Sequence, residues 1–316
     1  MIEYIIRRIL SGILVLFLLS TFLFFVMRLV PGNVVRLQLA DAGSVTPERM
    51  AEIEAQLGLD KPAYEQYFTW LGGAVQGDLG ESLWERRSVT EMIAERFPVT
   101  FELALLSILF AVALGVVIGV GSAIRRGSLL DNGLRTASLI GLSIPNFVIA
   151  LLMIVALSLW FNWVPPLGYE RPSENLWANL QQMMMPAFAL GIGVAAAIAR
   201  MTRSSMLEVL GADYIRTVRA KGAGERLINF KHALRNSMVP IITLIGLQFG
   251  ALLGGTVILE TIFNLPGIGS MVFRAVQQRD YPLIQAAGVL YGGIFVFVNI
   301  AVDVTYGWID PRIRRS

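Results

Sequence analysis

Few side chains in this sequence are of types that could carry out bond chemistry or bind a metal. The 316 residues include one histidine, His232, and no cysteine. One histidine without any cysteine does not make a plausible zinc site, and His232 is better explained as a helix residue facing a loop interior or a partner. No Ser-His-Asp arrangement is suggested either. We therefore expect that the chain is not an enzyme.

The three lysines, Lys61, Lys221 and Lys231, bear on nucleotide chemistry. A phosphate-binding loop of the form G-x-x-x-x-G-K-[ST] needs a glycine directly before its lysine, and none of these three lysines has one. If the chain takes part in an ATP-driven process, hydrolysis must occur on another chain. We expect no cofactor in this chain.

The acidic residues bear on proton-coupled transport. Glu102 and Glu260 lie at the ends of predicted membrane spans, and Asp303 lies near the inner end of the last one. Proton-coupled carriers usually place an acid deep in the helix bundle. A secondary transporter is therefore a less favoured alternative, and a membrane-embedded hydrolase is disfavoured because a catalytic set is missing.

The composition predicts a membrane protein. Hydrophobic residues make up 55% of the chain and charged residues 16%, with a mean hydropathy of +0.63. A soluble domain of this size would have close to a quarter of its residues charged. The net charge of +3 is small, and it argues for membrane topology rather than for nucleic-acid binding.

Long apolar runs predict an all-α membrane protein with six transmembrane helices. Each run is long enough, or nearly long enough, to cross a bilayer core. Pro145 is expected to kink the third span, and Pro186 is expected in the first turn of the fourth, where proline is tolerated. The predicted spans cover residues 9–30, 101–124, 135–161, 183–198, 239–259 and 283–304.

Basic residues at the two ends of the chain predict its orientation. Arg7 and Arg8 precede the first apolar run, and a DPRIRR segment occupies residues 310–315. Both ends are expected in the cytoplasm, as six crossings require. The alternative, a cleaved signal peptide, is disfavoured because the apolar run is too long and no small-x-small cleavage site follows directly.

Residues 31–98 are predicted to form a small external subdomain of short helices. Eleven acids in residues 33–98 oppose six lysines and arginines. Thr46 and Pro47 suit a helix start and Gly58 a helix stop, and Pro62 starts another helix. In that helix, Tyr64, Phe68 and Leu71 fall on one face. The subdomain contacts a substrate-binding protein, or it is a lid that only packs on the bundle; the sequence leaves both open.

The most informative stretch is basic and lies between the fourth and fifth spans, at residues 200–240. It holds eight arginines and lysines against three acids, so it is expected on the cytoplasmic side. A helical run ends at Gly222, a plausible helix stop, and a second run covers residues 225–237. A helix, a glycine turn and a second helix on the inner face of a membrane protein make a docking surface.

The residues of this stretch resemble a known family. The sequence YIRTVRAKG followed by HALRN is similar to the cytoplasmic loop of the inner-membrane permeases of ABC importers, in the dipeptide/oligopeptide/nickel branch. Gly222 matches the family glycine, whereas Arg216-Thr217-Val218 stand where the general motif has E-A-A, and Arg235 replaces its proline. SIPNF, LPGIG, RDYP, GLDKP and GDLGES resemble other parts of the same branch.

The resemblance implies the fold and the coupling role. It implies a type I ABC importer permease with six transmembrane helices, in which the short helix before the glycine inserts into a groove on an ATPase subunit. The residues implied in this coupling are Ala212, Asp213, Tyr214, Ile215, Arg216, Thr217, Arg219, Ala220, Lys221, Gly222 and Glu225.

The resemblance also implies partners, location and substrate. The partners are a second homologous permease subunit, two ATP-binding subunits that hold ATP and magnesium, a periplasmic or lipid-anchored substrate-binding protein, and membrane lipid. The location is the bacterial inner membrane. The chain would form half of the path of a peptide importer; nickel, an opine or an oligosaccharide is the alternative cargo.

Two features suggest where the path and its gate lie. The segment 261–282 is too broken by proline and glycine to cross, so we expect an outer gate or re-entrant element there. A methionine run at 183–185 could line an adaptable path, although such runs are more often plain packing. The candidate gate or path residues are Pro145, Met184, Leu265, Pro266 and Gly267.

Glycine spacing predicts close helix contacts. Gly115 and Gly119 are four apart, and Gly246, Gly250 and Gly254 form a stripe that suits an interface within the bundle or with a second permease. The expected organisation is a first helix at 1–30, an external region at 31–98, a five-helix core at 99–310 with its coupling loop at 200–238, and a tail at 311–316.

Overall fold

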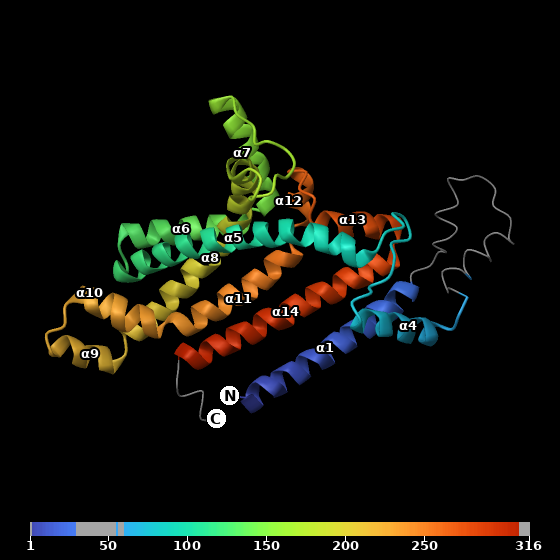
Figure 1. The fold of residues 1–316 in the computed structure, drawn as a ribbon. Coiled ribbons are helices and arrows are strands. Elements are labelled where there is room, and N and C mark those ends of the chain that lie inside the picture. The colour runs from blue at the N-terminus through green and yellow to red at the C-terminus, as the bar shows by residue number, and fades with distance from the viewer. Residues whose placement is uncertain (1, 30–54, 56–59, 310–316) are drawn as a thin grey trace. The chain divides into compact units, whose positions relative to one another are not determined.

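The computed structural model describes residues 2–29, 55 and 60–309, and these residues are almost entirely helical (Figure 1). The expected helix start at Thr46 and Pro47, the stop at Gly58 and the basic end at 310–315 lie outside the described residues. The described helices are α1 (Ile2–Leu29), α4 (Ala63–Val75), α5 (Val89–Ile124), α6 (Leu129–Ser143), α7 (Asn146–Phe161), α8 (Leu176–Leu210), α9 (Asp213–Ala220), α10 (Glu225–Leu227), the π-helix η1 (Ile228–Leu234), α11 (Met238–Gly254), α12 (Val257–Ile262), α13 (Ile268–Gln278) and α14 (Tyr281–Ile309).

The all-α fold class is confirmed, and the helices reach the six expected crossings only if each of two bent helix pairs counts as one span. Four helices are long and apolar enough to span a membrane: Ile6–Leu29, Val89–Ile124, Leu176–Leu210 and Tyr281–Thr305. Two further candidates are bent pairs, α6 with α7 at 102° and α10–η1 with α11 at 53°. The described residues therefore provide four to six candidate spans.

The chain divides into two compact units, and each has its own core. The first comprises residues 1–98 and 266–296, and the second residues 99–265 and 297–316. In the first unit, α13 and the beginnings of α5 and α14 share an apolar core. Its most buried members are Val89, Met92, Ile268, Met271, Leu283, Ala286 and Ala287.

In the first unit, α1 packs along α14 through small residues. A Cβ added at Gly288 would lie 2.5 Å from Leu23 Cδ1, and one at Gly12 would lie 2.5 Å from Val296 Cγ1. Close approach of this kind is how helices associate in lipid, where apolar burial alone gives no driving force. The two helices run antiparallel, because positions later in α1 meet positions earlier in α14.

In the second unit, α5 and α8 cross closely at glycines, as the sequence predicted for Gly115 and Gly119. A Cβ at Gly115 would lie 2.6 Å from the carbonyl oxygen of Ala195, and one at Gly119 would lie 2.7 Å from that of Ala199. Gly191 is equally confined from the α8 side. The glycine stripe that begins at Gly246 does not form one continuous helix contact within the described residues. Gly246 packs on Val302, whereas Gly254 has no neighbour within 4 Å of an added Cβ.

Prolines mark three corrections to the expected spans. Pro145 does not kink a continuous helix; it caps α7, and α6 ends two residues earlier at Ser143. Pro186 is buried well inside α8 rather than in its first turn, because α8 begins at Leu176, where the Asn175 side chain accepts a hydrogen bond from Ala178 N at 3.1 Å. The second span was expected to begin at residue 101, but α5 begins at Val89 and includes Pro98.

The helices near the coupling loop also differ from expectation. α8 continues to Leu210, so Arg200 and Arg203 belong to a helix rather than to a loop. The helix that was expected over 225–237 is a short turn of α-helix followed by the π-helix η1. The fifth span ends at Gly254, and α12 follows as a separate short helix.

Candidate functional site

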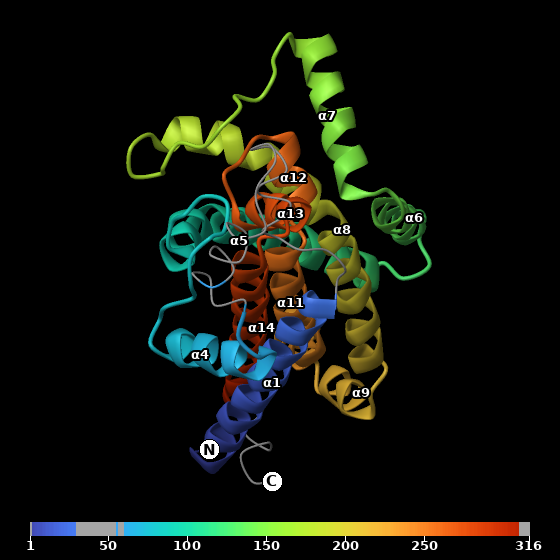
Figure 2. The same cartoon turned by 90° about the vertical axis from the view of Figure 1, so that its right-hand side faces the viewer.

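The residues predicted to couple to a partner lie together on one short segment. α9 is attached to the end of α8, away from α7, in both views (Figures 1 and 2). Ile215 is fully buried, whereas the polar and charged side chains of α9 are exposed. We call α9 together with Ala212, Lys221, Gly222 and Glu225 the coupling surface. The buried Ile215 fixes α9 to its own chain, and the exposed polar side chains leave α9 available to another chain.

The coupling surface owes its shape to the way α9 ends. Gly222 has φ +85°, the left-handed conformation that glycine adopts without a Cβ penalty. Its N–H donates to Arg219 O at 3.0 Å, and Ala223 N–H donates to Val218 O at 3.4 Å. These two bonds form a Schellman motif. The predicted helix stop at Gly222 is confirmed.

Polar contacts hold the coupling surface against the segment that follows it. Asn236 Nδ2 donates to Tyr214 Oη at 2.8 Å. Arg219 Nε donates to Glu225 Oε1 at 2.8 Å, and this hydrogen bond raises the pKa of Arg219. Arg219 and Glu225 are both exposed, so their bond orders the turn between α9 and α10 more than it stabilises the fold.

The π-helix η1 connects the coupling surface to the helices behind it. Ile228 and Ala233 are fully buried. Ala233 packs in a cluster with Val120 and Ala123 of α5 and Met206 of α8. π-Helical turns are uncommon and often occur at functional sites. The coupling surface is therefore linked to both α5 and α8 through η1.

A buried ion pair, which sequence reasoning missed, lies behind the coupling surface. Asp131 is 1% exposed and is bonded to Arg203 at 2.8 Å. Ser122 Oγ also donates to Asp131, and Gly127 N–H donates to it at 2.9 Å. In the sequence, Asp131 sat in a short polar loop and Arg203 among many arginines. The spacing of Asp131 and Arg203, 72 positions apart, gives no sign in the sequence that they pair.

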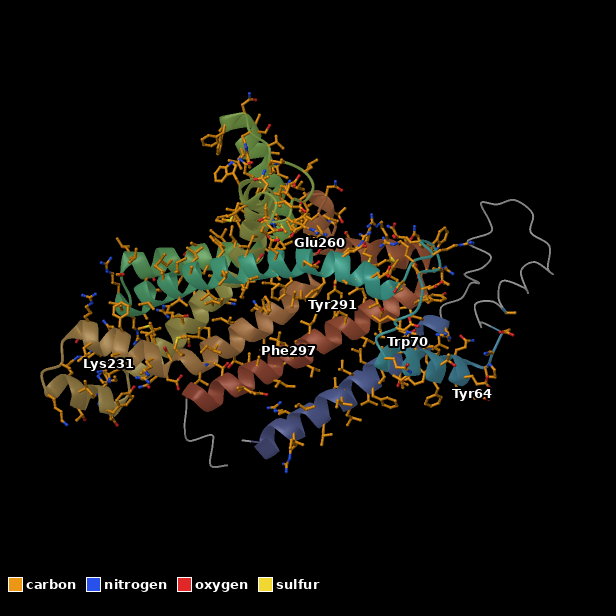
Figure 3. All side chains as sticks on the ribbon, viewed as in Figure 1. Tyr64, Trp70, Lys231, Glu260, Tyr291 and Phe297 are labelled. Carbon is orange, nitrogen blue, oxygen red and sulfur yellow. The ribbon has the colours of Figure 1, made fainter. Side chains whose placement is uncertain are left out.

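A second buried acid was placed wrongly from the sequence. Glu260, labelled in Figure 3, is fully buried in α12 rather than at the end of a span. Its Oε1 accepts hydrogen bonds from Thr100 Oγ1 at 2.8 Å and from Thr256 Oγ1 at 2.7 Å. An acid beside an apolar run is the signal that could have identified this residue.

The candidate gate or path residues lie on separate elements. Pro145 is exposed at the break between α6 and α7, and Met184 is half exposed on α8 between two buried methionines. Leu265 is buried after α12, where its N–H donates to Glu260 O at 2.8 Å. Pro266 and Gly267 precede α13, with Gly267 buried. The expected broken segment is thus two short helices joined by residues 263–267.

Comparison with known sequences gives family matches over nearly the whole chain. Residues 115–315 match the family described as binding-protein-dependent transport system inner membrane component, and residues 1–104 match its N-terminal companion family. The glutathione transport system permease protein GsiC of Escherichia coli K12 is 40% identical over 315 residues, 99% of each chain. The di/tripeptide transport system permease protein DppB of Pseudomonas aeruginosa is 41% identical over 336 residues, 100% of each chain.

Solved structures share the fold at low identity. An inward-facing form of the MetNI methionine ABC transporter aligns with a TM-score of 0.53 at 18% identity, covering 69% of this chain and 96% of that one. An amino acid ABC transporter solved with histidines aligns with a TM-score of 0.53 at 14% identity, covering 68% and 93%. The chain therefore belongs to the binding-protein-dependent transport system inner membrane component family, and it is a membrane-spanning permease subunit of an ABC importer, a transport component rather than an enzyme.

Proposed function

We propose that this permease subunit imports peptides and that its coupling surface docks on a separate ATPase subunit. The observation that supports the docking most directly is the exposure of α9 around its single buried residue, Ile215. The bonds that α9 makes to the following segment, from Asn236 to Tyr214 and from Arg219 to Glu225, lie at the surface, so its polar face stays available to another chain. Two ATPase subunits, which hold ATP and magnesium, supply the energy.

The proposed topology places the coupling surface, both chain ends and the ATPases in the cytoplasm. Basic residues concentrate at 200–240 and at both ends of the sequence, and cytoplasmic segments of membrane proteins carry such an excess. The region 31–98 then lies on the opposite side, where a substrate-binding protein delivers its cargo. A second permease subunit completes the path, in the bacterial inner membrane.

The proposed mechanism is alternating access driven through α8 and α5. The closed ATPase pair must bind one permease conformation more tightly than the other, since only differential affinity shifts a conformational equilibrium. α9 continues directly from α8, and η1 packs on α5 and α8. Movement of the coupling surface therefore has a packed route to two helices. Gating at Pro145, Met184 or residues 265–267 stays a prediction.

Reversing the charge at an exposed position of the coupling surface tests the docking. Arg216→Glu changes a side chain that is 76% exposed and should lower both the recovery of the ATPase subunits with the permease and the uptake of substrate. Arg126→Glu, an exposed arginine in the short loop after α5, is the matched control and should leave both unchanged. Full ATPase recovery with Arg216→Glu would contradict docking at this surface.

The substrate class is proposed from the relatives. GsiC is named for glutathione and DppB for di- and tripeptides, and no described residues group into a three-ligand metal site. We expect uptake of labelled short peptides, including glutathione, in a deletion strain that expresses the complete importer. If the importer took up nickel, an opine or an oligosaccharide and added peptides did not compete with that uptake, that solute would replace peptides as the assigned substrate. Uphill accumulation by the purified chain alone would instead indicate a secondary transporter.

A further inference from the structure

α4 has an apolar face that no described element covers. Tyr64, Phe68 and Val75 are 59%, 63% and 82% exposed, and their spacing places them on one side of the helix together with Leu71. α4 is not among the candidate spans. A short helix with one buried face, one exposed apolar face and a polar remainder is the pattern of a helix that lies in a membrane interface.

The buried face of α4 fixes it beside the last turns of α1. Tyr67 is 3% exposed, and its hydroxyl is 3.1 Å from Ser20 Oγ and 2.8 Å from Thr21 Oγ1. The Tyr67 ring packs edge-on against Phe24 with centroids 5.1 Å apart. The outward side of α1 is apolar and exposed, for example at Leu18 and Phe22. The free face of α4 is thus continuous with a lipid-facing helix.

Arg28, near the end of α1, is a half-buried cation with only neutral partners. Its guanidinium lies 3.4 Å from the centroid of the Phe24 ring. Nη2 and Nε donate to Gln66 Oε1 at 2.6 and 3.3 Å, and Nη1 donates to Phe24 O at 3.2 Å. None of the described residues offers Arg28 a carboxylate. A cation held out of water is stabilised best by an anion that bonds to it.

Further donors without acceptors lie in the same unit. Tyr281 is near enough to Arg28 to interact with its charge, and its buried hydroxyl has no hydrogen-bond partner. One turn on in α14, Gln285 is 3% exposed, and its Nε2 also has none. Trp70 Nε1, on α4 (Figure 3), is the third. Leu23 meets Gly288, so the antiparallel register sets Arg28 level with the first turns of α14. Every group in this set can donate.

We propose that the end of α1, α4 and the start of α14 bind the phosphate group of a phospholipid. The phosphate oxygens accept from the half-buried Arg28 guanidinium, close to Tyr281, and the apolar face of α4 rests in the same leaflet. A phospholipid fits both features, because it presents an anion with several acceptors directly above an acyl region. The assignment of this lipid to the leaflet away from the cytoplasm depends on the proposed topology. The site itself does not depend on it.

Lipid retention by the intact importer tests the phosphate contact. The solubilised complex is mixed with phosphatidylglycerol, or with diacylglycerol of the same chains as the form that lacks the phosphate, and bound lipid is counted by native mass spectrometry. Wild type should retain phosphatidylglycerol and not diacylglycerol. Arg28→Gln should weaken retention about tenfold, the effect of losing a hydrogen bond to a charged group. Arg171→Gln removes an exposed arginine from the 162–175 loop and should change nothing. Equal retention of the two lipids, or by Arg28→Gln and wild type, would overturn the proposal.

A second variant keeps the test independent of any folding defect at Arg28. Phe68→Trp places a reporter on the exposed face of α4, and in vesicles of acyl-brominated phosphatidylglycerol its added fluorescence should be quenched relative to the unsubstituted protein. An unquenched Trp at position 68 would refute the interfacial position of α4. Phe68→Glu should lower lipid retention; if it abolished capture of the substrate-binding protein and left lipid retention intact, the face would belong to that protein and the proposal would fail. These readouts need neither ATP nor uptake, so they are separate from the test of peptide import.

Discussion

Asp131 and Arg203 form a two-point ion pair across 72 positions of sequence: Arg203 Nε donates to Oδ1 and Nη2 to Oδ2, each at 2.8 Å. The pair joins the start of α6 to the last third of α8. Ser122 at the end of α5 and Gly127 in the following turn donate to the same carboxylate. Because α8 leads into α9, this cluster connects the helices behind the coupling surface.

Replacing Asp131 by asparagine should destabilise the permease. The variant keeps the shape but leaves Arg203 without its counter-ion, and breaking a buried pair by removing one partner costs about 3 kcal/mol. The measurement is the temperature at which half of the solubilised complex loses its monodisperse peak. Asp213→Asn, which breaks a pair exposed at both ends, should leave that temperature unchanged. Equal melting of the two variants would mean that the cluster carries no stability.

Gly119→Ala should weaken the crossing of α5 and α8. The new Cβ would lie 2.5 Å from Thr202 Cβ and 2.7 Å from Ala199 O, and the latter is backbone that cannot rotate away. Overpacking of this kind costs about 1–3 kcal/mol. Gly121→Ala, on the same helix, meets nothing within 4 Å and is the control. The two variants should differ in thermal stability, and a stable Gly119→Ala would show that the helices can separate freely.

Gly222→Val should uncouple ATP hydrolysis from uptake. Space is open around Gly222, so the effect comes from forcing a β-branched residue into φ +85°, at a cost of about 1–2 kcal/mol. The end of α9 should then shift, so that the coupling surface no longer fits the groove on the ATPase subunit. Gly224→Ala, two residues on, has open space and an ordinary φ of −69° and should transport normally. Transport and ATP turnover are measured together in reconstituted vesicles, and normal transport by Gly222→Val would count against the Schellman turn as a coupling element.

Asp280→Asn should loosen the loop before α5. Asp280 is 1% exposed and accepts from Ser82 Oγ at 2.5 Å and from Leu83 N–H at 3.3 Å. A neutral amide accepts less strongly than a carboxylate, so the loop should open more often and trypsin should cleave faster after Arg86 and Arg87. The exposed Glu91→Gln serves as control. Unchanged cleavage would indicate that the other bonds of the loop, among them Trp84 Nε1 to Gln278 O at 2.6 Å, hold it without the Asp280 carboxylate.

The sequence predicted features that depend on local chemistry. Gly222 was identified as a helix stop because a left-handed turn favours glycine, and Pro62 as a helix start because its φ is fixed. Gly115 and Gly119 indicated a close crossing because a helix repeats every three to four residues. Hydropathy indicated six spans, and the coupling surface followed from its basic residues and its resemblance to a family.

What the sequence could not predict depends on partners distant along the chain. Pro186 was placed at a helix start, but neighbouring helices bury it inside α8. Glu260 was placed at a span end, but Thr100, 160 positions earlier, bonds to its carboxylate in the core.

The sequence alone determined the class of the protein, its all-α fold and the helix stop at Gly222, because apolar length and turn chemistry act over a few residues. Only the tertiary structure decided which charges are buried, which donors meet an acceptor and where each span breaks. The physical reason is that Asp131 and Arg203, or Arg28 and Tyr281, are brought together by helix packing, and the cost of burying a charge depends on what packing places beside it.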